Sequence, residues 1–180
     1  FAAVALPATA QEITLKVHHF WPPGAMPPSM LLVPWCDRIA KDSGNRLKCQ
    51  IYPAMQLGGA PPQLIDQVKD GVADIVWTLP GYTAGRFPVM EVFELPFMSQ
   101  SAEATSQAAW DYYTRYGHTE FPGIKALAIN VHDNGYVHTV ARQVKVRADF
   151  KGLKMRAPTR QTNKMLGALG ATPVAMPLPA

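Results

Sequence analysis

Segments with strand and helix patterns alternate along the first 130 residues, and this alternation constrains the fold more than any other feature. Residues 12–20, EITLKVHHF, carry apolar side chains at every second position, as a strand with one buried face does. Glycines at 44, 71 and 117 are typical helix-ending residues. The expected strands are residues 12–20, 46–53, 73–79 and 123–130, and the expected helices are residues 29–43, 63–71 and 102–117. This order predicts an α/β domain with a mostly parallel sheet.

A second run of strand and helix patterns begins near residue 134. Its expected elements are strands over 135–141, 153–158 and 172–177, and a helix over 161–170. We therefore expect two domains, α/β domain I over residues 11–133 and the start of α/β domain II over residues 134–180. Residues 93–98, FELPFM, fit a short buried segment within domain I. Three strands close a sheet poorly, so the sequence predicts that the C-terminal part of domain II is missing.

The first ten residues, FAAVALPATA, differ in composition from the rest of the chain. They are small and apolar and end in Ala8-Thr9-Ala10, which fits the end of a secretory signal peptide with its A-x-A cleavage site. A frayed apolar terminus is the alternative. We predict export to the periplasm and a mature chain that begins near Gln11. No other apolar run approaches the ~18 residues of a membrane span, so no stable membrane insertion is expected.

The two cysteines and the charge balance add weaker constraints. Export makes a disulfide between Cys36 and Cys49 possible, but both residues also fit small buried apolar positions, and spacing does not decide between these alternatives. The formal net charge is +4, with Lys and Arg scattered among apolar residues. A nucleic-acid surface needs a dense basic face and a reading motif, and neither is visible, so we predict no nucleic-acid partner.

Motifs for catalysis and for cofactors are missing from the sequence. It contains no GxSxG, P-loop, GxGxxG or HExxH pattern, which argues against an enzyme and against a cofactor. His18 and His19 are neighbours on a strand and point to opposite faces, and no set of histidines has metal-ligand spacing. We therefore predict no metal site. The alternative is a secreted metal-dependent enzyme that uses His19, His132 and His138.

Aromatic and polar residues follow the expected strands of domain I. In α/β sheets, ligands bind beyond the carboxyl ends of the strands, where this sequence reads HHFW, WTLPGY and NVHDNGY. The candidate residues from the first two stretches are His19, Phe20, Trp21, Trp77 and Tyr82. Trp77 lies inside an apolar strand and fits the core equally well, whereas Tyr82 lies in a loop beside Gly81 and favours the site.

Arg156 is the most informative charged residue, because it ends an expected buried strand. A guanidinium is costly to bury unless an anion pairs with it. One possibility is a carboxylate of the same chain, such as Asp74 or Glu94. The other is the carboxylate of a ligand, held bidentately by the planar guanidinium. The position of Arg156 at a strand end, among other site candidates, favours the ligand.

Over about residues 12–180, the chain resembles the periplasmic substrate-binding proteins of TRAP transporters, the DctP type. The resemblance rests on YPAMQLGGAPPQLIDQVKDGVADIVW (52–77), VFELPFM (92–98) and DFKGLKMRAPTRQTNKMLGALGATPVAMP (149–177). The last stretch is the most specific: a GLKxR strand, a proline, a helix and LGATPVxMP.

This resemblance implies a fold, a function and partners. Members have a two-domain periplasmic-binding-protein-like α/β fold with a hinge and an interdomain cleft, and this chain would be such a fold truncated at its C-terminus. They are not enzymes. They capture a small organic acid between the domains and deliver it to the membrane subunits of a TRAP transporter. The arginine of the GLKxR strand, here Arg156, clamps the carboxylate. A ligand-sensing receptor domain of the same fold is a further alternative.

Departures from the family pattern narrow the expected ligand. Sialic-acid binders carry a second arginine near the position of Val137, next to His138, and an asparagine where this chain has Thr159. Sialic acid is therefore not expected. We predict a carboxylate ligand, such as an aromatic or 2-oxo acid, oriented by polar residues and buried by the aromatic candidates. The polar candidates are Asn134, Tyr136, His138 and Thr159.

Overall fold

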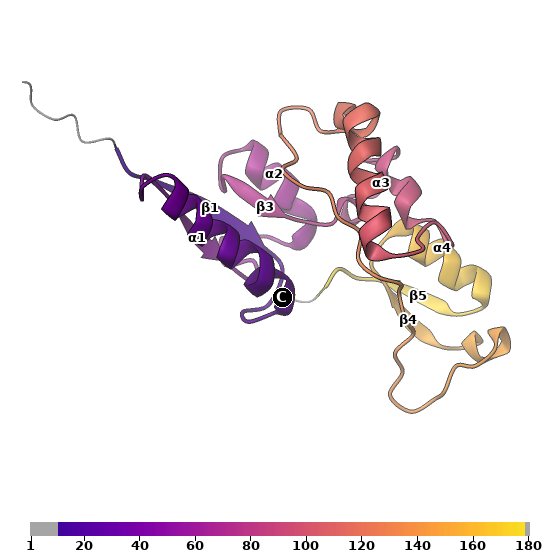
Figure 1. The fold of residues 1–180 in the computed structure, drawn as a ribbon. Helices are drawn as coiled ribbons and strands as arrows, with labels where there is room; N and C mark the ends of the chain where they lie inside the picture. The colour runs from indigo at the N-terminus through magenta and orange to yellow at the C-terminus, as the bar shows by residue number, and fades with distance from the viewer. Residues whose placement is uncertain (1–10, 179–180) are drawn as a thin grey trace, which may run out of the picture. The chain divides into compact units, whose positions relative to one another are not determined.

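A computed structural model describes residues 11–178 of the chain (Figure 1). Residues 1–10, to which the signal-peptide prediction applies, lie outside the described residues. The chain divides into two compact units between Trp77 and Thr78, here called unit one and unit two. The predicted domain boundary between residues 133 and 134 stays a prediction.

Unit one is built on a parallel sheet of three strands in the order β2-β1-β3. Its central strand, β1, is the alternating segment at the start of the sequence, and the two α-helices connect the strands in sequence. The elements are β1 Ile13–His19, α1 Val33–Asp42, β2 Leu47–Tyr52, α2 Leu64–Lys69 and β3 Ile75–Trp77. The strand predictions for 12–20, 46–53 and 73–79 are confirmed, as are the two helices between them.

The start of α1 reflects Pro34. The sequence predicts a helix from residue 29, with a proline inside it. In the structure a π-helical turn, Pro28–Leu32, leads into α1, and Pro34 occupies its first turn. Pro34 has no N–H to donate to the preceding turn, and the regular α-helical hydrogen bonding is interrupted here by the π-helical turn.

One face of the unit-one sheet packs against α1. Val17 of β1 is fully buried with Leu32 and Cys36. The register aligns Val17 with Ile51 on β2 and Ile75 on β3, and both pack against the same cluster. The alternation of β1 therefore places odd-numbered residues on the α1 face and His18 on the other face.

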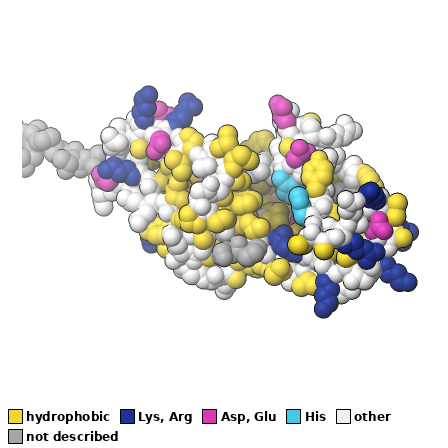
Figure 2. All heavy atoms as spheres, turned by 90° about the horizontal axis from the view of Figure 1, so that it is seen from below, with side chains coloured by type: hydrophobic (Ala, Val, Ile, Leu, Met, Phe, Trp, Pro, Cys, Tyr) yellow, Lys and Arg dark blue, Asp and Glu magenta, His cyan; other side chains and the backbone are white. Residues whose placement is uncertain are grey.

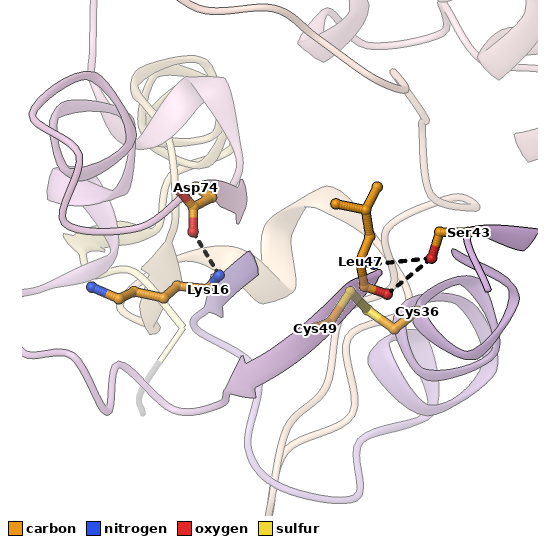
Figure 3. Close-up of a disulfide and its surroundings, with 6 residues drawn as sticks. All are labelled: Lys16, Cys36, Ser43, Leu47, Cys49 and Asp74. Atoms are coloured by element: carbon orange, nitrogen blue, oxygen red, sulfur yellow. Dashed lines mark hydrogen bonds between the residues drawn. A yellow bond between two sulfur atoms is a disulfide. The ribbon is translucent and has the colours of Figure 1, made fainter. Parts of the chain in front are cut away.

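A disulfide joins α1 to the sheet (Figure 3). Cys36 on α1 and Cys49 on β2 are bonded, with their Cα atoms 5.6 Å apart. Of the two alternatives for these cysteines, the bridge is the one that the structure contains. In the same view, the Ser43 hydroxyl bonds both backbone groups of Leu47, where the loop enters β2.

Unit two contains a smaller parallel sheet, β4-β5, and two longer helices. The elements are α3 Ala102–Arg115, β4 Lys154–Ala157, α4 Arg160–Leu169 and β5 Thr172–Ala175, with short 3-10 turns at Pro80–Tyr82, Met90–Glu94, Gly117–Glu120 and Arg147–Phe150. Ala157, Leu166 and Ala171 are buried between α4 and the sheet. The helix predictions for 102–117 and 161–170 are confirmed, as are the strands predicted at 153–158 and 172–177.

The ends of both helices follow from local sequence. The Ser101 side chain accepts a hydrogen bond from the Ala104 N–H at the start of α3. Gly170 ends α4 with φ +97°, a left-handed conformation that glycine adopts without steric cost.

Three other predictions for unit two are wrong. Residues 123–130 and 135–141 form no strand, and residues 135–141 are exposed. Both segments have strand-like sequences, but neither pairs with a strand in the described chain. Their backbone groups therefore have no partner strand with which to form the hydrogen bonds of a sheet. Residues 93–98 are not a buried segment either. The turn Met90–Glu94 ends there, and the side chains of Leu95, Phe97 and Met98 are exposed.

Candidate functional site

In unit two, Arg156 and Tyr82 meet the same short segment after β5. The Nε of Arg156 donates a hydrogen bond to the Pro177 carbonyl oxygen at 3.3 Å. The N–H of the next residue, Leu178, donates to the Tyr82 hydroxyl at 3.1 Å. Because Pro177 and Leu178 are consecutive, these two bonds bring Arg156 and Tyr82 to one segment, although 74 residues separate them in sequence.

Arg156 is exposed, and the expectation that β4 is a buried strand is wrong. The sheet has two strands, and α4 covers only one of its faces, so Met155 and Ala157 pack inward while Lys154 and Arg156 point outward. Within residues 11–178, Arg156 makes no ion pair with Asp74, Glu94 or any other acid. Its charge therefore remains available to an external anion.

Thr159 starts α4, three residues after Arg156. It is buried, and its hydroxyl accepts a hydrogen bond from the Thr162 N–H at 3.3 Å. The side chains of Thr159 and Glu94 both lie close to Gly81. A Cβ at Gly81 would overlap the Glu94 carboxyl and lie 2.7 Å from the Thr159 Cγ2. Gly81 is therefore required by close approach, and it places Tyr82 beside the start of α4.

Glu94 adjoins the candidate residues Thr159 and Tyr82, because its carboxyl lies against Gly81. Its Oε2 is buried and has no hydrogen-bond partner among the described atoms. Burial raises the pKa of this carboxyl and the charge of Glu91 adds to the effect, against a hydrogen bond from Thr159 and the attraction of Arg160 and His132. From the sequence, Glu94 was identifiable only as a possible partner of Arg156.

A second carboxylate, Glu91, anchors the start of α4. It is buried and accepts hydrogen bonds from the backbone N–H of Gly85 at 3.0 Å, and from the side chains of Arg160 at 2.6 Å and Gln161 at 3.2 Å. Burial by itself would raise the pKa of Glu91, but these donors outweigh it and lower the pKa. Glu91 therefore carries its charge at neutral pH and fixes the turn that follows Arg156.

In unit one, the aromatic candidates gather at the carboxyl ends of β1 and β3. His19 lies opposite Trp77 in the parallel register. The Trp21 ring lies 4.9 Å from the Phe20 ring and meets Trp77 edge-on, with ring centres 6.1 Å apart. His19 and Phe20 are buried, whereas Trp21 and Trp77 are half-buried. The structure thus brings His19, Phe20, Trp21 and Trp77 together at one edge of the sheet, and their role in ligand binding stays a prediction.

Two nitrogens in this aromatic group have no hydrogen-bond partner among the described atoms. They are Nδ1 of His19 and Nε1 of Trp21, and both are shielded from solvent. Burial lowers the pKa of His19, the neighbouring His18 lowers it further, and a backbone hydrogen bond to Trp21 opposes the effect. His19 is therefore neutral at pH 7.

The remaining polar candidates, Asn134, Tyr136 and His138, lie on an exposed, irregular stretch. The N–H of Asn134 bonds the side chain of the adjacent Asp133 at 2.8 Å. No hydrogen bond within residues 11–178 joins these three side chains to Arg156. Their role in ligand binding stays a prediction.

Two other kinds of site were considered, a metal site and a basic nucleic-acid surface. Residues 11–178 contain no group of three His, Cys, Asp or Glu side chains arranged to hold a metal ion. On the face that Figure 2 shows, Lys and Arg side chains lie in small separate groups and form no continuous basic patch.

Comparison with known proteins gives these features a context. The family model of bacterial extracellular solute-binding proteins, family 7 (DctP), matches residues 18–179. A TRAP solute-binding protein from Rhodoferax ferrireducens T118, solved with copurified benzoate, is 56% identical, with a TM-score of 0.90 over 93% of this chain and 52% of that one. A marine metagenome TRAP protein specific for aromatic acid ligands, solved with 3-hydroxybenzoate, is 51% identical, with a TM-score of 0.90 and the same coverage.

Curated relatives are more distant. The 2,3-diketo-L-gulonate-binding periplasmic protein of Escherichia coli (strain K12) is 30% identical over 78% of this chain and 44% of its own length. The chain spans about half the length of the curated relatives it matches. Across the part that the structure describes, no helix combines the length and the hydropathy that a membrane span requires.

Proposed function

Because the chain belongs to the DctP family of bacterial extracellular solute-binding proteins, we propose that it is part of a periplasmic receptor for an aromatic carboxylate. The receptor captures the acid reversibly, performs no chemistry on it and delivers it to the membrane subunits of a TRAP transporter. The fold and the family support this reading, and two relatives above 50% identity were solved with benzoate and 3-hydroxybenzoate.

Arg156 is the observation that carries the proposal. Its guanidinium is exposed, makes no ion pair within residues 11–178, and uses Nε to bond the Pro177 carbonyl. That bond fixes the side chain and leaves the two Nη groups to the ligand. A guanidinium presents paired N–H donors that match a carboxylate, and such charge-assisted bonds are about twice as strong as neutral ones. Arg156 therefore supplies the carboxylate contact, and Tyr82 and Thr159 border it.

In unit one, the aromatic group is a separate candidate for contact with a ligand. His19, Phe20, Trp21 and Trp77 offer ring faces and edges, which bury a flat ligand at little entropic cost. Such rings favour an aromatic acid over a sugar acid, whose many hydroxyls need many polar partners. Asn134, Tyr136 and His138 remain candidates for further polar contacts.

The test measures binding by the full-length protein. Benzoate should raise the melting temperature, because a ligand at a thousandfold excess over Kd adds about 4 kcal/mol to the free energy of unfolding. Arg156→Ala should abolish the shift, and Arg156→Lys, which keeps the charge but loses the paired donors, should retain only part of it. Lys154→Ala, an exposed cation on the same strand, is the matched control. Unchanged benzoate affinity in Arg156→Ala would disprove the clamp.

A further inference from the structure

The chain leaves the β4-β5 sheet at a proline. The Met176 N–H still donates a hydrogen bond to the Ala157 carbonyl oxygen of β4, at 3.2 Å. Pro177 has no N–H, so it cannot donate the next hydrogen bond of a ladder. The hydrogen bonds at Pro177 and Leu178 lead to side chains instead.

A single peptide group joins Arg156 to Tyr82. The Pro177 carbonyl oxygen accepts from Nε of Arg156 at 3.3 Å, and the Leu178 N–H donates to the Tyr82 hydroxyl at 3.1 Å. This C=O and this N–H belong to the same peptide unit, which is planar and trans, so they point in opposite directions. A hydrogen bond that fixes the direction of the N–H therefore also fixes the direction of the carbonyl.

The carbonyl direction decides how the Arg156 guanidinium is oriented. The guanidinium is planar, so a hydrogen bond at Nε also sets the directions of both Nη groups. Arg156 is exposed on the face of β4 that α4 does not cover, where packing restricts a long side chain little. Within residues 11–178, the bond to Pro177 is the hydrogen bond that holds this side chain. An arginine held in its binding orientation loses less rotamer entropy when a ligand arrives, and it binds more tightly.

Tyr82 itself is firmly anchored. Its N–H donates to the Leu79 carbonyl oxygen at 3.0 Å. The preceding residue, Gly81, is buried against the Glu94 carboxyl and the Thr159 Cγ2. The segment after β5, by contrast, belongs to no helix or strand. The tyrosine therefore fixes the peptide group, and not the reverse.

We propose that Tyr82 is a positioning residue for carboxylate binding. Its hydroxyl orients the Pro177–Leu178 peptide group, and this group orients the Arg156 guanidinium. The sequence predicts Tyr82 as a ligand contact, whereas this role requires no contact with the ligand. The inference rests on the proposed function, because it takes Arg156 as the carboxylate clamp, and it adds a residue on which that clamp depends.

The test measures benzoate affinity by calorimetry in the full-length protein. Tyr82→Phe keeps the ring and removes the acceptor, so it should weaken binding about fivefold, the value of one hydrogen bond. In an Arg156→Lys background the same change should cost less than about twofold, because lysine has no planar group for the peptide unit to orient. Tyr113→Phe is the matched control and should leave affinity unchanged. The Tyr113 hydroxyl also accepts from a backbone N–H, that of Ala126 at 3.4 Å.

NMR spectroscopy of the Arg156 Nε–H supplies a readout that needs no ligand. Its resonance, identified by its loss in Arg156→Lys, should exchange with water faster in Tyr82→Phe and at the wild-type rate in Tyr113→Phe. Leu178→Pro removes the donor of the same hydrogen bond and leaves Tyr82 intact. It should reproduce both effects, and it replaces Tyr82→Phe if that variant folds poorly.

Equal losses of affinity from Tyr82→Phe in the wild-type and Arg156→Lys backgrounds would show that Tyr82 contacts the ligand itself, and would overturn the inference. Wild-type affinity in Tyr82→Phe would overturn it too, as would an unchanged exchange rate of the Arg156 Nε–H. If benzoate does not bind the wild type, the proposed function fails, and the exchange rate alone decides whether Tyr82 orients Arg156.

Discussion

Nε of Arg160 donates a hydrogen bond to the Glu91 carboxylate at 2.6 Å, and Nη2 of the same guanidinium lies 2.6 Å from the same oxygen. The Glu91 side chain is 4% exposed, whereas that of Arg160 is 42% exposed. The charge of the buried Glu91 is therefore compensated by the more exposed Arg160. This pair ties the turn Met90–Glu94 to the first turn of α4, four residues beyond Arg156.

The first prediction concerns that pair. Glu91→Gln removes the buried charge and leaves the half-exposed Arg160 guanidinium facing a neutral amide. We expect the free energy of unfolding to fall by about 1–2 kcal/mol, because the charge-assisted hydrogen bonds to Glu91 become weaker. Denaturant unfolding measures the change. Asp111→Asn, an exposed carboxylate on α3, is the matched control and should change stability by less than about 0.5 kcal/mol. Equal effects of the two variants would contradict the anchoring role of Glu91.

The second prediction concerns the close approach at Gly81. In Gly81→Ala, the new methyl group meets the Glu94 carboxyl and lies 2.7 Å from the Thr159 Cγ2. We expect a loss of about 1–3 kcal/mol, as for other overpacked sites, and weaker acid binding, because Tyr82 and the start of α4 must separate. Gly135→Ala is the control, since nothing lies within 4 Å of a Cβ there. If Gly81→Ala kept the stability and the acid affinity of the wild type, the side chains of Glu94 and Thr159 would have moved aside without cost. The close approach would then not require glycine.

Local sequence patterns predicted most of the secondary structure because they determine it. The alternation of β1 and the glycine after α4 act within a few residues, and both predictions were confirmed. The predicted strands 123–130 and 135–141 failed for a nonlocal reason. A strand needs a neighbour, and the sequence of a segment contains no information about what lies beside it.

Some residues of the candidate site were likewise identifiable from the sequence, and others were not. Arg156, Tyr82 and Thr159 were identifiable from motif and position, and the structure places them around the ends of the β4-β5 sheet. Glu91 and Glu94 were not identifiable, because their partners lie about 70 residues away in the chain. A glycine directly before a candidate tyrosine was the only signal of the tight contact with Glu94.

The third prediction concerns the disulfide. The bridge between Cys36 and Cys49 closes a loop across 13 positions, so it restricts the unfolded chain. Loops of this length are worth about 3 kcal/mol in the loop-entropy model. We expect dithiothreitol to lower the melting temperature of the wild type, and to have no effect on a Cys36→Ala/Cys49→Ala double variant, which should already melt lower. Identical melting of the wild type with and without reductant would show that the bridge does not stabilise the fold.

The last prediction concerns pH and His18, which is fully buried on the face of β1 opposite Val17. Nε2 of His18 accepts from the Leu57 N–H at 3.4 Å, so Nδ1 carries the proton that bonds the Gln67 side chain at 2.8 Å.

Only the neutral ring makes both bonds, and burial is the main cause that lowers the pKa of His18. The unfolded chain, with a histidine pKa near 6.5, therefore takes up a proton that the folded protein excludes. The free energy of unfolding should consequently fall as the pH drops below about 6.5, since stability decreases with falling pH wherever the unfolded state binds more protons.

Urea unfolding at pH 7.5 and 5.5 measures this difference. His18→Gln should lower stability at pH 7.5 and reduce the pH difference, with the remainder due to His19, whose pKa burial also lowers. A His18→Gln variant with the full wild-type pH dependence would exclude His18 as its source.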